Sequence, residues 1–179
     1  RADQMIADLQ HQHIQALTVS IRSIEKETLK AAMQTGYYGP LKTIPGIGPI
    51  LGMTIALETG EISRFPSAEK FASYCRTVAA QRMTNEQPKG RNNRKCGNRY
   101  LAWALVEAAN FAKRYDPRCR QWYDRKLAKR GNVIATKALA CKLAKAAWHI
   151  MRSGRPYDAD RIFPQPHRAA KSQPEMKGD

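Results

Sequence analysis

Basic side chains are concentrated in one stretch of the chain, between residues 76 and 99. They are Arg76, Arg82, Lys89, Arg91, Arg94, Lys95 and Arg99, against a single acid, Glu86. Gly and Asn residues interrupt the stretch, and it carries no apolar periodicity. A basic segment of this kind suits the phosphates of a nucleic-acid backbone, which it would bind through charge rather than through base sequence. The alternative is an ordinary solvated loop.

A second candidate site is the glycine turn Pro45-Gly-Ile-Gly-Pro49, which leads into an apolar stretch ending at Gly60. Pro49 suits the first position of a helix, and Gly60 suits its C-cap. We expect a helix-hairpin-helix unit whose amides near Ile47 and Gly48 are unpaired at a helix N-terminus, where a phosphate can approach. The alternative is a close helix–helix turn whose apolar residues only join the core.

Together these two stretches give the predicted DNA contacts. They are Gly46, Ile47, Gly48, Arg82, Lys89, Arg91, Arg94, Lys95, Asn98 and Arg99. The overall charge favours the same partner, because 31 Lys and Arg face 15 Asp and Glu, for a formal charge of +16. Residues 1–60 are neutral, so the whole excess follows Gly60 and indicates a polyanionic partner for that part.

The composition contains no catalytic or metal-binding pattern. Four separated cysteines, at positions 75, 96, 119 and 141, lack the paired spacing of a zinc or redox site and are interpreted as free thiols in a reducing compartment. Acidic residues are scattered, so no carboxylate cluster for two-metal chemistry is expected. No apolar run approaches the roughly 18–20 residues that cross a bilayer, and a membrane partner is not expected.

The fold class expected from the sequence is all-α. Residues 3–34 lack Pro and Gly and repeat apolar residues at steps of three and four, which predicts a long helix with a coiled-coil-like stripe. That stripe fits a bundle helix or a dimer seam. Residues 1–36 are assigned to the end of a coiled-coil connector, 37–163 to a compact helical domain with a long basic loop, and 164–179 to a disordered tail. No convincing strand is found.

Further helices follow from caps and apolar stripes. Ser67, Asn98 and Asp116 are predicted N-caps, and Gly154 is expected to end the last helix, which begins near Val133. The first of these helices is expected to pack through Phe71 and Tyr74 on the apolar helix that follows the glycine turn. The predicted inward positions are Leu101, Ala104, Leu105, Ala108, Phe111 and Ala112 in one helix, and Leu139, Leu143, Ala147 and Ile150 in the last.

The order of these motifs resembles the C-terminal transposase domain of the DEDD insertion-sequence transposases. The resemblance rests on residues 41–60, on 65–74, on Lys95-Cys-Gly-Asn-Arg-Tyr-Leu-Ala and on Lys137-Ala-Leu-Ala-Cys-Lys-Leu-Ala, and it spans about residues 37–163. The family includes the Piv-type DNA invertases and the bridge-RNA-guided recombinases. The opening of the basic loop, Tyr74-Cys-Arg-Thr-Val-Ala, is most similar to the eleven-eleven branch.

The resemblance implies a two-part enzyme. An N-terminal RuvC-like domain would hold Mg²⁺ on four acidic residues, and the C-terminal domain would supply a serine nucleophile. No cofactor is expected in this chain itself, which resembles the second part and begins without Met. The family serine aligns with Thr84, and close relatives carry a serine where this chain has Ala80. Three interpretations of Thr84 follow. It is a working nucleophile, the copy of the element has decayed, or an active serine has been replaced.

The first hypothesis is therefore the DNA-binding and nucleophile-bearing half of a transposase or site-specific recombinase, inactive as this chain alone. The resemblance implies DNA as substrate, a guide RNA as the source of target choice, a homo-oligomer in the full-length protein, and a cytoplasmic, nucleoid-associated location in a bacterium. The alternative is a non-catalytic helix-hairpin-helix DNA-binding module.

Overall fold

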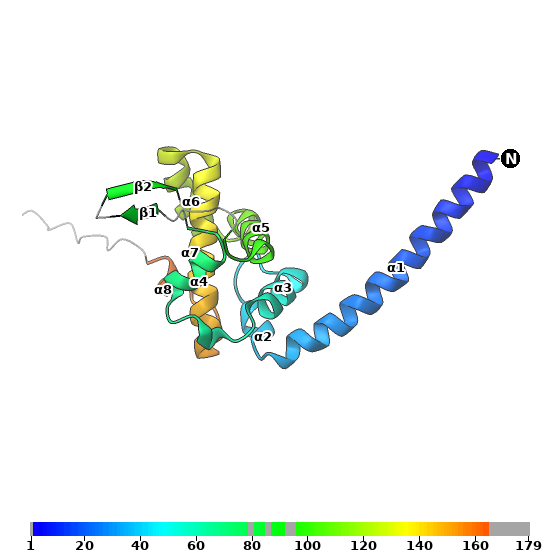
Figure 1. The fold of residues 1–179 in the computed structure, drawn as a ribbon, viewed down its shortest axis with the longest axis horizontal. Coiled ribbons are helices and arrows are strands. Elements are labelled where there is room, and N and C mark those ends of the chain that lie inside the picture. The colour runs from blue at the N-terminus through cyan, green and yellow to red at the C-terminus, as the bar shows by residue number, and fades with distance from the viewer. Residues whose placement is uncertain (1, 79–80, 85–86, 92–95, 165–179) are drawn as a thin grey trace, which may run out of the picture.

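The computed structural model describes residues 2–78, 81–84, 87–91 and 96–164. Helices predominate, so the predicted all-α class is confirmed. The elements in order are α1 (Ala2–Gln34), α2 (Tyr38–Leu41), α3 (Pro49–Thr59), the short 3₁₀ helix η1 (Ile62–Arg64), α4 (Ala68–Tyr74), strands β1 (Gln81–Thr84) and β2 (Gln87–Arg91), α5 (Arg99–Tyr115), α6 (Pro117–Arg130), α7 (Asn132–Ser153) and α8 (Ala159–Ile162). Figure 1 shows α1 extending away from a compact domain built by the later helices.

Helix α1 is long, as the sequence predicts, and it is almost entirely exposed. Ala32 is its one buried residue. The stripe residues Ile14, Leu17, Ile21 and Ile24 are 50–66% exposed. The apolar stripe therefore has no partner among the described residues, and its assignment to a connector that ends at residue 36 stays a prediction.

Helix α7 is the centre of the domain, where α4, α5 and α6 pack around it. Its predicted inward residues Leu139, Leu143 and Ala147 are fully buried, and Ile150 is nearly so. Small side chains such as Ala140 and Ala144 are buried on the same helix, which lets neighbouring helices approach closely. The core prediction for this helix is confirmed.

Local signals set the helix ends. Ser67 Oγ accepts from Lys70 N–H at 3.3 Å, and Asp116 Oδ1 accepts from Cys119 N–H at 2.6 Å. Asn98 Oδ1 accepts from the amides of Tyr100 and Leu101 at 2.8 and 3.0 Å. Gly154 ends α7 in the left-handed region, at φ +67°. These caps satisfy helix-end groups that would otherwise be unpaired, and they confirm the predicted boundaries.

Two packing predictions are wrong. Helix α4 packs chiefly on α7 rather than on α3, because the turn through η1 directs the chain onto α7. Trp148 on α7 fixes that turn by donating from Nε1 to the carbonyl oxygen of Phe65 at 3.1 Å. Phe111, expected in the buried stripe of α5, is 40% exposed and lies parallel to the exposed ring of Tyr115, with 6.4 Å between centroids.

The basic loop contains strands that the sequence did not indicate. β1 and β2 form an antiparallel pair, in which Gln81 faces Arg91 and Thr84 faces Gln87. The pairing shifts between Gln81 and Met83, which is typical of a β-bulge. The prediction that this chain has no strand is therefore wrong at residues 81–84 and 87–91, while the helical class stands.

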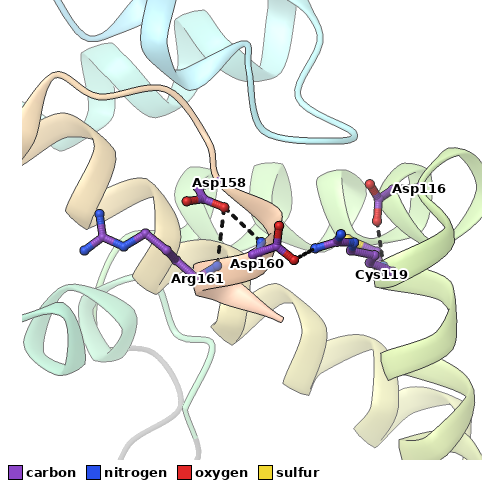
Figure 2. Close-up of polar contacts among 6 residues, drawn as sticks. Asp116, Cys119, Asp158, Asp160 and Arg161 are labelled. Carbon is purple, nitrogen blue, oxygen red and sulfur yellow. Dashed lines mark hydrogen bonds and ion pairs between the residues drawn. The ribbon is translucent and has the colours of Figure 1, made fainter. Parts of the chain in front are cut away.

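The C-terminal segment folds back onto α6, as Figure 2 shows. Asp158 Oδ1 caps α8 by accepting from the amides of Asp160 and Arg161 at 2.9 and 3.4 Å. An ion pair between Arg118 and Asp160 joins α8 to α6. Just beyond α8, Phe163 is 5% exposed. The compact domain therefore includes residue 163, and residues 165–179 of the predicted disordered tail lie outside the described residues.

Candidate nucleic-acid interface

The two ends of the basic segment are joined at its base. Arg76 donates from Nε and Nη2 to the carbonyl oxygen of Gly97, at 2.9 and 2.6 Å. The Asn98 amide donates to Tyr74 O at 2.8 Å. Gly97 has φ +96°, and a Cβ there would lie 2.3 Å from Tyr74 O, so a larger residue does not fit. The base of the segment is thus held against the ends of α4 and α5.

Asn98 and Arg99 lie at this base, at the start of α5. Asn98 caps the helix with its side-chain oxygen and donates from Nδ2 to Glu58 Oε2 at 2.6 Å, which ties α5 to α3. Arg99 is exposed, and its guanidinium lies 4.7 Å from the centroid of the Tyr100 ring. A hydrogen bond to Tyr100 Oη raises the pKa of Arg99, which keeps the side chain charged. Asn98 therefore has a structural role, and Arg99 presents its charge to solvent.

The other predicted residues of the basic segment lie on or beyond the β-hairpin. Arg82 lies at the bulge of β1, and Lys89 and Arg91 lie on β2. Thr84 pairs with Gln87, so it is at the end of the hairpin farthest from its base. Arg94 and Lys95 lie outside the described residues. The backbone thus brings three of the predicted cations onto one two-stranded ribbon.

The glycine turn between α2 and α3 is a packing site as well as a candidate phosphate site. Gly46 has φ +84°, and a Cβ there would lie 2.2 Å from the Ala108 carbonyl oxygen on α5. The expectation of a free amide is wrong for Ile47, whose N–H donates to Ile44 O at 3.1 Å and whose side chain is 5% exposed. The Gly48 amide donates to no described residue, and Gly48 is exposed at the N-cap of α3.

The structure separates the glycine turn from the basic segment. Gly46 packs near Ala108 and Ala112, whereas the basic segment is anchored at Asn98. At 1.5 Å per residue, the ten to fourteen helical residues between them span about 15–21 Å. In Figure 1, α2 and α3 lie on the side of the domain nearer α1, and β1 and β2 project from the other side. The two predicted stretches of DNA contacts are therefore anchored apart, because α3 and α5 run side by side, with the glycine turn and the base of the basic segment near opposite ends.

A cavity of about 460 Å³ opens beside the base of the hairpin, between α5 and the start of α7. Its lining residues are Arg76, Thr77, Ala102, Val106, Asn110, Lys113, Asn132, Val133, Thr136 and Lys137. The sequence analysis did not single out Lys113 or Lys137 for binding. In the sequence, Lys113 and Lys137 belong to two separate helices, α5 and α7. Only the packing of α5 on α7 places them at one cavity.

Hydrogen bonds order the polar side of this cavity. Asn132 Oδ1 accepts from Tyr123 Oη at 2.7 Å and from Thr136 Oγ1 at 3.1 Å. Lys113 Nζ lies 3.5 Å from Thr136 Oγ1 and 4.7 Å from the centroid of the Tyr123 ring. The lysine is therefore fixed beside the first turn of α7, where the positive end of the helix dipole adds to its charge.

No metal centre can be assembled from the described residues, since across them no three His, Cys, Asp or Glu side chains gather closely enough to hold an ion. Burial raises the pKa of the Cys119 thiol to about 12, and the carboxylate of Asp116 acts in the same direction. Cys119 is therefore a protonated core residue rather than a nucleophile. Among the described helices, none combines the length and the apolar character needed to cross a bilayer.

Comparison with known proteins gives a consistent set of relatives. Residues 39–124 match the family described as Transposase IS116/IS110/IS902. Over 148 residues, covering 80% of the chain and 44% of the relative, the chain is 28% identical to the transposase for insertion sequence element IS1328 of Yersinia enterocolitica. It is 25% identical over 159 residues to an uncharacterized 44.8 kDa protein of insertion element IS116 from Streptomyces clavuligerus, covering 87% of the chain and 39% of that protein.

A shorter match has a higher identity. Over 78 residues the chain is 35% identical to the putative transposase y4qE of Sinorhizobium fredii, covering 44% of the chain and 20% of that protein. The chain spans less than half the length of each of these relatives. The match to the family includes the glycine turn, the β-hairpin and all of α5.

Proposed function

We propose that this chain, whose residues 39–124 match the family described as Transposase IS116/IS110/IS902, is the DNA-binding half of a transposase or site-specific recombinase. The observation that supports this most strongly is the contact of Arg76 with Gly97, which joins the two ends of the basic segment at the base of the β-hairpin. Arg76 and Gly97 hold a ribbon bearing Arg82, Lys89 and Arg91 against a rigid helical domain. A ribbon held in this way can lie along a DNA backbone without first having to order its ends.

The proposed chemistry is strand exchange by a hydroxyl nucleophile, Thr84. Its oxygen would attack a DNA phosphorus, forming a protein–phosphate ester as the bond to one DNA oxygen breaks. That DNA oxygen would take a proton, and a second DNA hydroxyl would later displace the threonine to rejoin the strand. The β-methyl group of threonine restricts χ1 and crowds the phosphorus, so we expect slower attack than by serine.

Mg²⁺ does not fit the described part of the chain, because no three of its His, Cys, Asp or Glu side chains gather closely enough to hold an ion. The metal site expected for the full-length protein would therefore draw its ligands from a RuvC-like part.

Salt dependence tests DNA binding. The logarithm of the affinity for duplex DNA should fall linearly with the logarithm of salt concentration, with a slope of about −0.9 per phosphate contact. Replacing Arg91, Arg94 and Lys95 by Ala should reduce that slope by about 2–3. The matched control replaces Arg22, Lys26 and Lys30 on α1, removes the same charge, and should leave the slope unchanged. A slope near zero for the unmodified chain would contradict the proposal.

Adduct trapping tests the nucleophile, and it needs the full-length protein. Thr84→Ser should form more covalent protein–DNA adduct than the unmodified protein, and Thr84→Ala should form none. If none of the three forms an adduct while salt-dependent binding persists, the second candidate function holds: a non-catalytic helix-hairpin-helix DNA-binding module. The threonine at the serine position favours that alternative.

Helix α1 supports the proposal of a homo-oligomer. Its exposed stripe of Ile14, Leu17, Ile21 and Ile24 has the spacing of a coiled-coil seam, and pairing two copies would bury it. Light scattering should give a dimer mass or higher that Leu17→Glu lowers to that of a monomer, while Val19→Glu, at another exposed apolar residue of α1, retains it.

We further propose a guide RNA as the source of target choice, and the nucleoid of the bacterial cytoplasm as the location, because DNA is the proposed substrate.

A further inference from the structure

We propose that the cavity between α5 and α7 holds one unpaired nucleotide of the DNA, with its base on the apolar wall and its phosphate beside Lys113 and Lys137. The inference rests on the proposed function, since it takes DNA as the substrate. It adds a site for a single nucleotide that the charge of the hairpin alone does not imply.

The size of the cavity selects the ligand. Its volume of about 460 Å³ is within the range of roughly 300–1,000 Å³ seen for small-molecule pockets. A double helix, whose major groove alone is about 12 Å wide, cannot enter such a space. A nucleotide turned out of the stack can, and proteins that hold such a nucleotide bind it in a pocket of its own.

The apolar wall suits a nucleobase. Ala102 and Val106 on α5 and Val133 on α7 line the cavity, and the Val133 side chain is 80% exposed. Covering these side chains with the flat face of a base would remove apolar surface from water on both partners. Since this contact does not depend on the edge of the base, the pocket should accept any of the four bases.

The polar side suits a phosphate. Neither Lys113 nor Lys137 forms an ion pair with a described Asp or Glu. The first backbone bond of α7 runs from Ala135 N–H to Gly131 O, and Gly131 provides no side-chain cap. The amides of the first turn, which include that of Val133, are therefore available at the same edge as the two lysines.

The position of the cavity connects it to the hairpin. Arg76 and Thr77, where the chain leaves α4 toward the hairpin, line the same cavity. Thr77 is itself fixed, because its Oγ1 donates to Ala72 O at 2.7 Å. A DNA strand that follows the hairpin to its base thus reaches the opening, and the nucleotide at that point can leave the stack.

Binding of two duplexes to the 179-residue chain tests the proposal. One duplex carries a single unpaired 2-aminopurine, and the other has the same 2-aminopurine paired with thymine. The chain should bind the bulged duplex about tenfold more tightly, because the cost of unstacking is already met. The fluorescence of the unpaired 2-aminopurine should also change on binding.

Two variants assign the effect to the cavity. Val106→Trp fills it, and Lys137→Glu, at an exposed position, reverses charge at its edge; both should lose the preference for the bulged duplex. Lys129→Glu on α6, at an exposed lysine outside the cavity lining, is the charge-matched control and should keep the preference for the bulged duplex. Circular dichroism checks folding, and Lys137→Glu remains informative if Val106→Trp unfolds.

The possible outcomes distinguish a failure of the nucleotide site from a failure of DNA binding. Equal affinity for the two duplexes overturns the inference and leaves the proposed function standing. A preference that survives in folded Lys137→Glu and Val106→Trp places the nucleotide elsewhere and also overturns it. Failure to bind either duplex overturns the proposed function and this inference together.

Discussion

Arg76 and Gly97 meet at the base of the basic hairpin, where the guanidinium donates two hydrogen bonds to one carbonyl oxygen, at 2.9 and 2.6 Å. Both residues have a positive φ, +55° for Arg76 and +96° for Gly97. A bulky residue in this conformation carries strain, so the surrounding contacts must over-determine it. The contact fixes where a segment of twenty residues leaves the domain and where it returns.

Arg76→Ala should loosen that base. Hydrogen bonds from a charged donor contribute about 1.5–3 kcal/mol, so local opening should become roughly tenfold or more frequent. Thermolysin should cleave within residues 77–97 correspondingly faster under native conditions. Arg125→Ala is the control, because the Arg125 side chain bonds within its own helix, to Gln121 O at 3.3 Å. Equal cleavage rates in the two variants would show that Arg76 does not hold the segment.

Gly46→Ala should destabilise the domain strongly, by about 4 kcal/mol or more, because the new Cβ would meet the backbone of α5 and the chain cannot shift it cheaply. Gly36→Ala is the matched control. Gly36 has a similar φ of +71°, but nothing lies within 4 Å of the added Cβ. Gly36→Ala should lower the unfolding free energy by only about 1–2 kcal/mol, the cost of a side chain at a positive φ. Urea unfolding followed by circular dichroism measures both, and equal losses would contradict the close packing of the turn on α5.

Asn98→Asp should keep the helix cap and place a second carboxylate against Glu58. At pH 7 the like charges should destabilise the domain by about 1–3 kcal/mol, since the donor to Glu58 is lost as well. Repulsion between the two carboxylates is the physical reason for the loss, and urea unfolding at pH 7 measures it.

Glu58→Gln combined with Asn98→Asp restores a donor and an acceptor across the same contact, and it should recover most of the loss at pH 7. Unfolding free energies of the single and double variants at pH 7 and pH 5 measure this coupling. A double variant no more stable than Asn98→Asp alone would show that the contact between α3 and α5 does not stabilise the domain.

The thiols should separate into slow and fast classes. Burial raises the pKa of Cys119 to about 12, and it also raises the pKa of the buried Cys75, so neither forms thiolate at pH 8. Cys96 is exposed. A colorimetric disulfide reagent should therefore modify Cys96 at least about 100-fold faster than Cys75 and Cys119, and Cys96→Ser should remove that fast phase.

The same pKa shift has a consequence for stability. The Cys119 thiol ionises at about 8.5 in an unfolded chain. The stabilisation of the folded state by the buried neutral thiol is therefore complete below that pH and is lost as the pH rises toward 12. Cys119→Ala should flatten the fall of the unfolding free energy over that range. An equally steep fall in the variant would contradict the raised pKa.

Much of the fold could be predicted from the sequence, because its signals are local. A cap such as Ser67 or Asp116 acts on amides two or three residues away, and Pro49, Gly60 and Gly154 act on their own φ angles. Apolar periodicity likewise predicts the buried face of α7 within a single helix. The motifs also indicated the resemblance to the family that residues 39–124 match, because their order along the chain needs no knowledge of contacts.

Apart from the Ile47 amide, which bonds to Ile44 O three residues earlier, the features that differ from prediction depend on contacts between distant residues. The hairpin of Gln81–Thr84 with Gln87–Arg91 contains Pro88 and Gly90, which disfavour a strand locally, so only the pairing reveals it. The partner of α4, and the exposure of Phe111 on a helix whose opposite face is buried, follow from which helices meet.

The sequence by itself therefore determined the longer helices, their ends, the excess of positive charge after Gly60 and the resemblance to a transposase family. Tertiary structure alone decided that the glycine turn and the basic hairpin lie at opposite ends of α5, and that Lys113 and Lys137 share one cavity. The physical reason is that helix ends and buried faces depend on residues within a few positions. The meeting of two surfaces depends instead on how α3, α5 and α7 pack, to which every helix in the core contributes.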